Sequence, residues 1–168
     1  VRDGANRSDS TMPTRRTFTL SAAAAVAAAT LPGCGNESSN KKSHFVLMLG
    51  RDRADLPYPN VFDPLILRVD PGDEVTFVPT QPGHASSYAQ GMIPAAAEPW
   101  NGDLDVATTV TLNEPGVYGY ICVPHYHMGM VGVIVVGDRL DNLEEIRKVE
   151  HPARANGVFD QILAEQTG

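Results

Sequence analysis

The segment Tyr120–Met130, YICVPHYHMGM, places five side chains with sulfur or imidazole nitrogen donors on one short stretch of chain. They are Cys122, His125, His127, Met128 and Met130. A thiol, an imidazole and a thioether are soft donors that bind transition metals such as copper and zinc. Cys122 and His125 are separated by two residues, so both can reach one ion. The segment therefore predicts a metal site.

A further donor comes from His84, which follows an expected strand in PTQPGHAS. Two histidines and one cysteine in a plane, with a distant methionine sulfur, form the ligand set of a blue-copper site. The three strong ligands suit both oxidation states of copper, and the weak axial sulfur adjusts the reduction potential. Zinc also accepts cysteine and histidine, but a thioether is a poor zinc ligand. We therefore expect copper, with Met128 and Met130 both open as the axial ligand.

The bulk composition limits the function classes. The chain has 168 residues, which suits one domain with extensions. Thirteen basic and 20 acidic residues give a formal charge of −7. Nucleic-acid binding needs clustered lysine and arginine, so we expect no nucleic-acid partner. The 13 prolines and 15 glycines indicate many turns and favour a β-rich body.

From His44 onward, short apolar runs are broken by turn residues, which predicts strands and a β-sandwich of antiparallel strands. The last part of the chain instead shows helical periodicity, with acidic residues early and basic residues late in DRLDNLEEIRKVE. We expect two helices at about 139–166 that cover one side of the sandwich. The expected strands are 44–49, 61–69, 73–80, 105–112, 114–122 and 130–138.

The first third of the chain has the composition of an export signal. Arg15 and Arg16 precede an apolar run, Leu20–Leu31, that is too short to span a bilayer. The arginine pair resembles a twin-arginine signal, and a chance pair before an ordinary secretory signal is the alternative. We expect an upstream segment and export signal over 1–33, a polar tether over 34–43, and a single domain over 44–168.

The sequence LPGC, which ends at Cys34, resembles a bacterial lipobox. Cleavage before Cys34 would leave a cysteine that carries a lipid and anchors the protein to a membrane. The alternatives are plain cleavage with a free thiol, or a Cys34–Cys122 disulfide in an oxidising compartment. We expect lipidation, which also removes the reactive thiol, and the disulfide is least favoured because Cys122 is a candidate metal ligand. From Cys34 onward the chain has nine basic and eighteen acidic residues, a net charge of −9.

Three motifs resemble the pseudoazurins, a class of bacterial cupredoxins: PGDEVTFVPTQPGH, GMIP at 91–94, and CVPHYHMGMVGVIVVGD. The resemblance covers about 44–165. It implies an all-β fold, an eight-stranded Greek-key sandwich with two C-terminal α-helices, and a periplasmic one-electron carrier rather than an enzyme. Met130 has the pseudoazurin spacing from His125, whereas Met128 has the shorter amicyanin spacing. The resemblance thus implies one type 1 copper bound by His84, Cys122, His125 and Met130.

The chain departs from this family beside the expected copper. Many cupredoxins carry asparagine after the first histidine, where this chain has Ala85, and we expect Ser86 or a backbone amide to replace it in part. Pseudoazurins typically carry lysines around the copper, and this chain has Pro82 and Ile121 at matching places. We therefore expect an apolar docking surface around His125 and a basic or membrane-bound redox partner. The expected surface residues are Met92, Ile93, Pro94, Pro124 and Met128.

The expected function is thus a monomeric, lipid-anchored electron carrier. The alternative is a copper-binding chaperone or storage protein that transfers the ion rather than electrons. A chaperone exposes labile ligands on a flexible segment, whereas strands hold the expected ligands here. His127 is assigned to the rim of the site. His44 and His151 have no assigned role and are too few for a second, catalytic copper centre.

Overall fold

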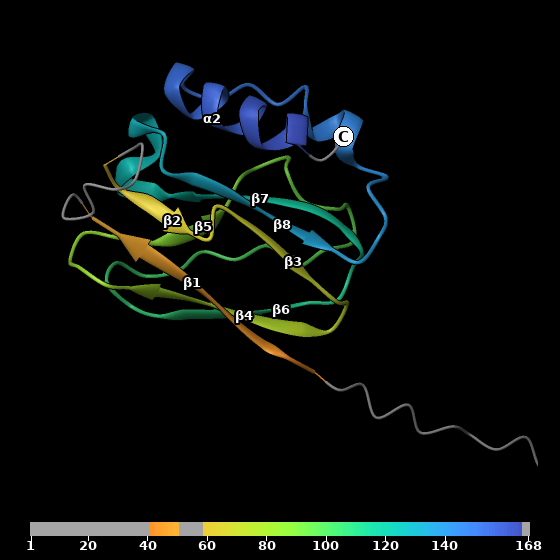
Figure 1. The fold of residues 1–168 in the computed structure, drawn as a ribbon, viewed down its shortest axis with the longest axis horizontal. Coiled ribbons are helices and arrows are strands. Elements are labelled where there is room, and N and C mark those ends of the chain that lie inside the picture. The colour runs from red at the N-terminus through yellow and green to blue at the C-terminus, as the bar shows by residue number, and fades with distance from the viewer. Residues whose placement is uncertain (1–40, 51–58, 166–168) are drawn as a thin grey trace, which may run out of the picture. The chain divides into compact units, whose positions relative to one another are not determined.

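The computed structural model describes residues 41–50 and 59–165, in which eight strands form two four-stranded sheets (Figure 1). One sheet has the strand order β2-β1-β4-β6 and the other β3-β8-β7-β5. The expected all-β sandwich is confirmed. The strands are β1 Ser43–Leu49, β2 Val61–Asp63, β3 Ile66–Val69, β4 Asp73–Pro79, β5 Ser86–Tyr88, β6 Thr108–Leu112, β7 Gly116–Cys122 and β8 Val131–Val136.

Strand β8 has a continuous apolar sequence because both of its faces are covered. Ile134 and Val136 lie in the cluster between the two sheets. Val131, Val133 and Val135 point the other way, into a second cluster that contains the helical residues. Alternate side chains of β8 therefore pack into two different hydrophobic cores, because successive side chains of a strand point to opposite faces.

The single strand expected over 61–69 is wrong, because Pro64 and Leu65 separate β2 from β3. Proline has no amide hydrogen to donate, so it interrupts a ladder of backbone hydrogen bonds. Strand β2 pairs antiparallel with β1, and β3 pairs parallel with β8 in the other sheet. Strands β1 and β4 are also parallel, so the sheets are mixed rather than wholly antiparallel as expected. The short edge strand β5 was not expected either.

The C-terminal helices cover the outer face of the sheet that contains β7 and β8 (Figure 1). Helix α2, Ala153–Ala164, buries Val158, Phe159, Ile162 and Leu163 there. The expected first helix is only one α-helical turn, α1 Leu143–Ile146. The chain beyond it tightens, because Lys148 and Val149 donate to carbonyls three residues back. Within the described residues, no helix is long and apolar enough to cross a bilayer.

The expected signal at 1–33 and most of the tether lie outside the described residues. Lys42 is already part of the domain: its N–H donates to Asp73 Oδ1 at 2.9 Å, and its carbonyl accepts from Glu74 N–H. Strand β1 then begins at Ser43. Lys42 and Ser43 thus make contacts of the domain, although both precede the expected boundary at His44.

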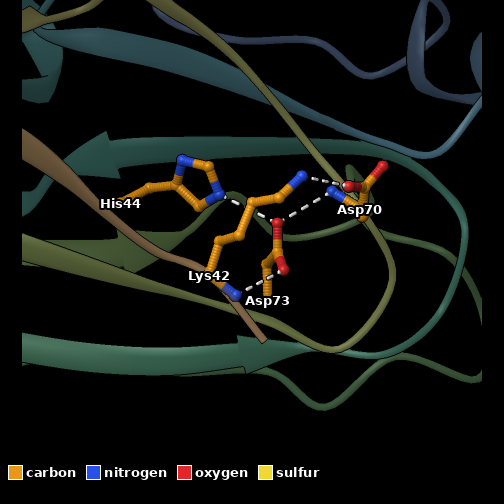
Figure 2. Close-up of polar contacts among 4 residues, drawn as sticks. All are labelled: Lys42, His44, Asp70 and Asp73. Atoms are coloured by element: carbon orange, nitrogen blue, oxygen red, sulfur yellow. Dashed lines mark hydrogen bonds and ion pairs between the residues drawn. The ribbon is translucent and has the colours of Figure 1, made fainter. Parts of the chain in front are cut away.

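Asp73 is the centre of the polar network that holds the start of β1 (Figure 2). Its side chain is buried and accepts from Asp70 N–H at 3.0 Å and from His44 Nε2 at 2.8 Å, in addition to Lys42 N–H. Burial alone would raise the pKa of Asp73, but the hydrogen bonds from Lys42, His44 and Asp70 outweigh it and lower the pKa to about 2. The carboxylate is therefore ionised at neutral pH and ties β1 to β4.

Candidate metal centre

Three of the expected ligands meet at one end of the sandwich. Cys122 Sγ lies 3.6 Å from His84 Nδ1 and 3.5 Å from His125 Nδ1, and the three donor atoms all lie within 4.8 Å of one another. His84 and Cys122 are buried, whereas His125 is half-buried. Across the described residues, this is the one group of three or more His, Cys, Asp or Glu side chains close enough to share an ion.

Separate elements bring these side chains together. Cys122 is the last residue of β7 and pairs with Ser86 of β5. His125 follows in the 3-10 helix η1, Val123–Met128. His84 lies in the loop between β4 and β5. Sheet pairing fixes the backbone at Cys122, and a helical turn fixes it at His125, so the fold itself holds these two donors in position.

The chain returns from η1 to β8 through a tight turn that includes Met130. Gly129 has a φ of 86°, in the left-handed region that glycine adopts without strain. Met130 N–H then donates to the carbonyl of His125 at 3.2 Å, and Cys122 N–H donates to the carbonyl of Met130 at 2.9 Å. These two bonds hold Met130 beside both loop ligands.

The two candidate axial methionines have different surroundings. Met130 is fully buried and belongs to the same apolar cluster as Cys122. Met128 ends η1 and is only half-buried. The burial of Met130 and its backbone bonds to the loop ligands favour it as the axial residue.

The environment of the donors is suited to metal binding. Burial, together with the charge of neighbouring His125, lowers the pKa of His84, so its imidazole is neutral at pH 7 and has a nitrogen lone pair for a metal. Burial also raises the pKa of the Cys122 thiol, so this side chain keeps its proton until a bound cation displaces it. Hydrogen bonds from the backbone N–H groups of Ala85 and His125 act in the opposite direction and favour the thiolate.

These amide bonds bear on the asparagine that Ala85 replaces. Since the backbone of Ala85 lowers the pKa of the Cys122 thiol, it is a candidate for the expected backbone substitute. The hydroxyl of Ser86 has a different neighbour: its Oγ accepts from Trp100 Nε1 at 3.0 Å in the buried interior. Ser86 therefore supports the tryptophan beside the site.

The expected docking surface is wrong at three of its residues. Met92 is fully buried, and a Cβ on Gly119 would lie 2.9 Å from its side chain. Pro94 packs against Gly116, the first residue of β7, whereas Cys122 is the last. At about 3.3 Å per residue, the two ends of β7 lie roughly 20 Å apart. Met92, Ile93 and Pro94 therefore do not belong to the surface around the metal ligands.

The other expected surface residues, Pro124 and Met128, lie in η1 with His125. The structure adds exposed apolar side chains that the sequence did not single out, namely Leu104, Val106 and Val123, each more than half exposed. Leu104 and Val106 flank Asp105, which is hydrogen-bonded to the His84 loop. His127 is exposed, in line with its place at the rim.

Comparison with known proteins supports copper as the ion for this donor set. Residues 59–137 match the sequence model of the copper binding proteins of the plastocyanin/azurin family. Pseudoazurin from Methylorubrum extorquens is 40% identical over 105 residues, 62% of this chain and 71% of the relative. Pseudoazurin from Paracoccus pantotrophus is 35% identical over 144 residues, 86% of this chain and 93% of the relative.

A solved structure agrees with these sequence relationships. A pseudoazurin from Sinorhizobium meliloti has a TM-score of 0.69 and 41% identity, with 74% of this chain and 95% of the other covered. The donor set of two imidazoles and one thiol fits copper. With its sandwich, its C-terminal helices and its copper-type donors, this chain belongs to the pseudoazurins, copper-binding proteins of the cupredoxin fold.

Proposed function

We propose that this protein carries single electrons through one type 1 copper bound by His84, Cys122, His125 and Met130. The main support is the convergence of the first three donors within 4.8 Å in a chain of this family. When bound, copper supplies a centre that gains and loses one electron at a potential set by its ligands. The chain supplies the fixed positions of those ligands.

The fixed backbone around the donors suits electron transfer. Cys122 and Met130 are fully buried, and His84 is 1% exposed, so the protein excludes water from three of the four proposed ligands. Strand pairing holds Cys122 in place, and the hydrogen bonds of the return turn hold Met130. His125, which is half-buried, provides the route by which an electron enters or leaves.

The axial ligand can be tested with two matched variants. Met130→Leu removes the thioether and keeps a side chain of similar volume, and we expect it to change the reduction potential and the visible spectrum of the copper-loaded protein. Met128→Leu makes the same chemical change two residues away, and we expect it to leave both nearly unaltered. The reverse result would assign the axial position to Met128.

Retention of the ion separates an electron carrier from a copper chaperone. The copper-loaded protein would be reduced and reoxidised repeatedly in the presence of a Cu(I) chelator, and bound copper measured after each cycle. Because three of the four proposed ligands are buried and Cys122 lies in a paired strand, we expect the copper to stay with the protein. Release of Cu(I) to the chelator within the first cycles would contradict the carrier role and favour copper transfer.

We also propose the partner surface and its chemistry. The docking surface consists of exposed apolar residues beside the ligand loops, in place of Met92, Ile93 and Pro94. The protein acts as a monomer and docks through this surface. The excess of acidic residues from Cys34 onward favours a basic or membrane-bound partner over an acidic one. The proposed docking residues are Pro82, Leu104, Val106, Val123 and Pro124.

Periplasmic location, twin-arginine export and a lipid on Cys34 remain part of the proposal. Support comes from the Arg15–Arg16 pair, the apolar run and the LPGC motif. Intact mass of the mature protein tests this: we expect an N-terminal lipidated Cys34, and an unmodified N-terminus would contradict it.

A further inference from the structure

Asp105 binds both backbone polar groups of the proposed copper ligand His84. Its Oδ1 accepts from Gly83 N–H at 2.5 Å and from His84 N–H at 3.1 Å. Its own N–H donates to the carbonyl of His84 at 2.7 Å. This exposed residue is therefore joined to the ligand loop by three hydrogen bonds, although it lies 21 positions along the chain.

The segment 100–105 reaches the ligand loop by running along the edge of the sheet. Tyr88 N–H donates to the carbonyl of Trp100 at 3.1 Å, and Gly102 N–H donates to that of Ser86 at 2.8 Å. Asp105 follows with a φ of 61°. Aspartate tolerates this left-handed conformation better than most residues. The conformation places the Asp105 carboxylate toward Gly83.

Gly83, the residue before His84, adds little stiffness to this loop. Gly83 has a φ of 100°, and a Cβ at this position would lie 3.9 Å from His125 Cε1. A glycine in this conformation gains no stiffness from a side chain. The carboxylate that accepts both consecutive amides fixes the peptide from which the His84 imidazole projects.

The charge of Asp105 also reaches the metal site. Its carboxylate accepts hydrogen bonds from the backbone of Gly83 and of the ligand His84, so it lies close to the donors. A negative charge at this place favours positive charge on a metal held between them. Because Cu(II) carries one more positive charge than Cu(I), the carboxylate stabilises the oxidised ion more.

We propose that Asp105 is a positioning residue for the copper site: its carboxylate fixes the backbone of His84, and its charge lowers the reduction potential. The inference rests on the proposed ligand set.

Three variants separate the two effects. Asp105→Asn removes the charge but keeps an acceptor oxygen and the tolerance for a left-handed φ. Asp105→Gly removes charge and acceptor while the backbone keeps its conformation without strain. Asp103→Asn is the matched control, because Asp103 is an exposed carboxylate of the same loop for which no side-chain bond to Gly83 or His84 is found.

Amide hydrogen exchange in the copper-free protein tests the positioning effect. Loss of a hydrogen bond of ordinary strength predicts that Gly83 and His84 amides exchange about tenfold faster in Asp105→Gly. In Asp105→Asn and Asp103→Asn we expect exchange close to that of the wild type. Unchanged exchange in Asp105→Gly would overturn the positioning role.

Redox titration of the copper-loaded protein tests the charge effect. We expect Asp105→Asn to shift the Cu(II)/Cu(I) equilibrium about threefold toward Cu(I), which is roughly 28 mV at 59 mV per tenfold change. A shift no larger than that of Asp103→Asn would overturn the charge effect. If the proposed function fails, the wild-type protein will lack the blue copper spectrum. The exchange measurement on the copper-free protein still decides whether the hydrogen bonds of Asp105 position His84.

Discussion

Replacing Asp73 should destabilise the fold without altering the copper site. Asp73→Asn keeps the shape of the side chain but removes the charge that accepts from Lys42, His44 and Asp70 (Figure 2). The pKa falls from 3.8 to about 2 on folding, and one pKa unit corresponds to about 1.4 kcal/mol. The ionised carboxylate therefore contributes about 2 kcal/mol to the free energy of unfolding at neutral pH.

The sign of this contribution fixes its pH dependence. Because folding depresses the pKa of Asp73, its contribution is fully present above the unfolded value of 3.8 and is lost as the pH falls toward 2. The difference in stability between wild type and Asp73→Asn should therefore shrink from about 2 kcal/mol at pH 7 to less than about 1 kcal/mol at pH 2.

Urea denaturation of the copper-free protein measures this difference, since bound metal would add its own pH dependence. The emission of Trp100, the one tryptophan in the chain, reports on the core, where its ring stacks on Phe77. Asp70→Asn is the control, because Asp70 bonds the exposed Lys42 ammonium at the surface. The reasoning is refuted if the control is equally destabilised, or if the Asp73→Asn deficit persists at pH 2.

Three further predictions concern the core, the ligand loop and docking. Gly132→Ala would place a Cβ 2.5 Å from the buried Tyr120 ring, so we expect chemical denaturation to show a loss of about 1–3 kcal/mol; Gly157→Ala, in α2 with open space around it, should instead gain up to about 1 kcal/mol. Tyr126→Phe removes the 2.6 Å bond between the phenol and His151 Nδ1, and thermal unfolding should show a loss of about 1 kcal/mol; an unchanged midpoint would mean that the bond contributes nothing. Reduction by a cationic complex should slow as salt rises, because the chain is acidic; salt-independent rates would leave only the apolar surface to guide docking.

The metal ligands could be predicted because their chemistry is local in sequence. Cys122 and His125 lie on one turn, and His84 follows a strand whose period was readable. Donor type and spacing alone therefore pointed to copper, and the structure places these three donors together. The break between β2 and β3 was also within reach, because Pro64 cannot donate to a sheet ladder.

The surroundings of the site could not be predicted because strand register and irregular loops determine them. The sequence gives no sign that Met92 packs on Gly119, so GMIP was placed beside the ligands instead of along the body of β7. Asp105 reaches His84 through an irregular segment whose hydrogen bonds have no periodic pattern. Contacts of this kind depend on tertiary packing rather than on local residue preference.

Visible absorption during a copper titration tests the central claim most directly. A type 1 site made by the Cys122 thiolate and two imidazoles should bind one equivalent of Cu(II) and become intensely blue through thiolate-to-copper charge transfer. The colour should disappear on reduction, return on reoxidation, and be absent from Cys122→Ser. A wild-type protein that stays colourless with copper bound, or whose colour survives in Cys122→Ser, would contradict the account.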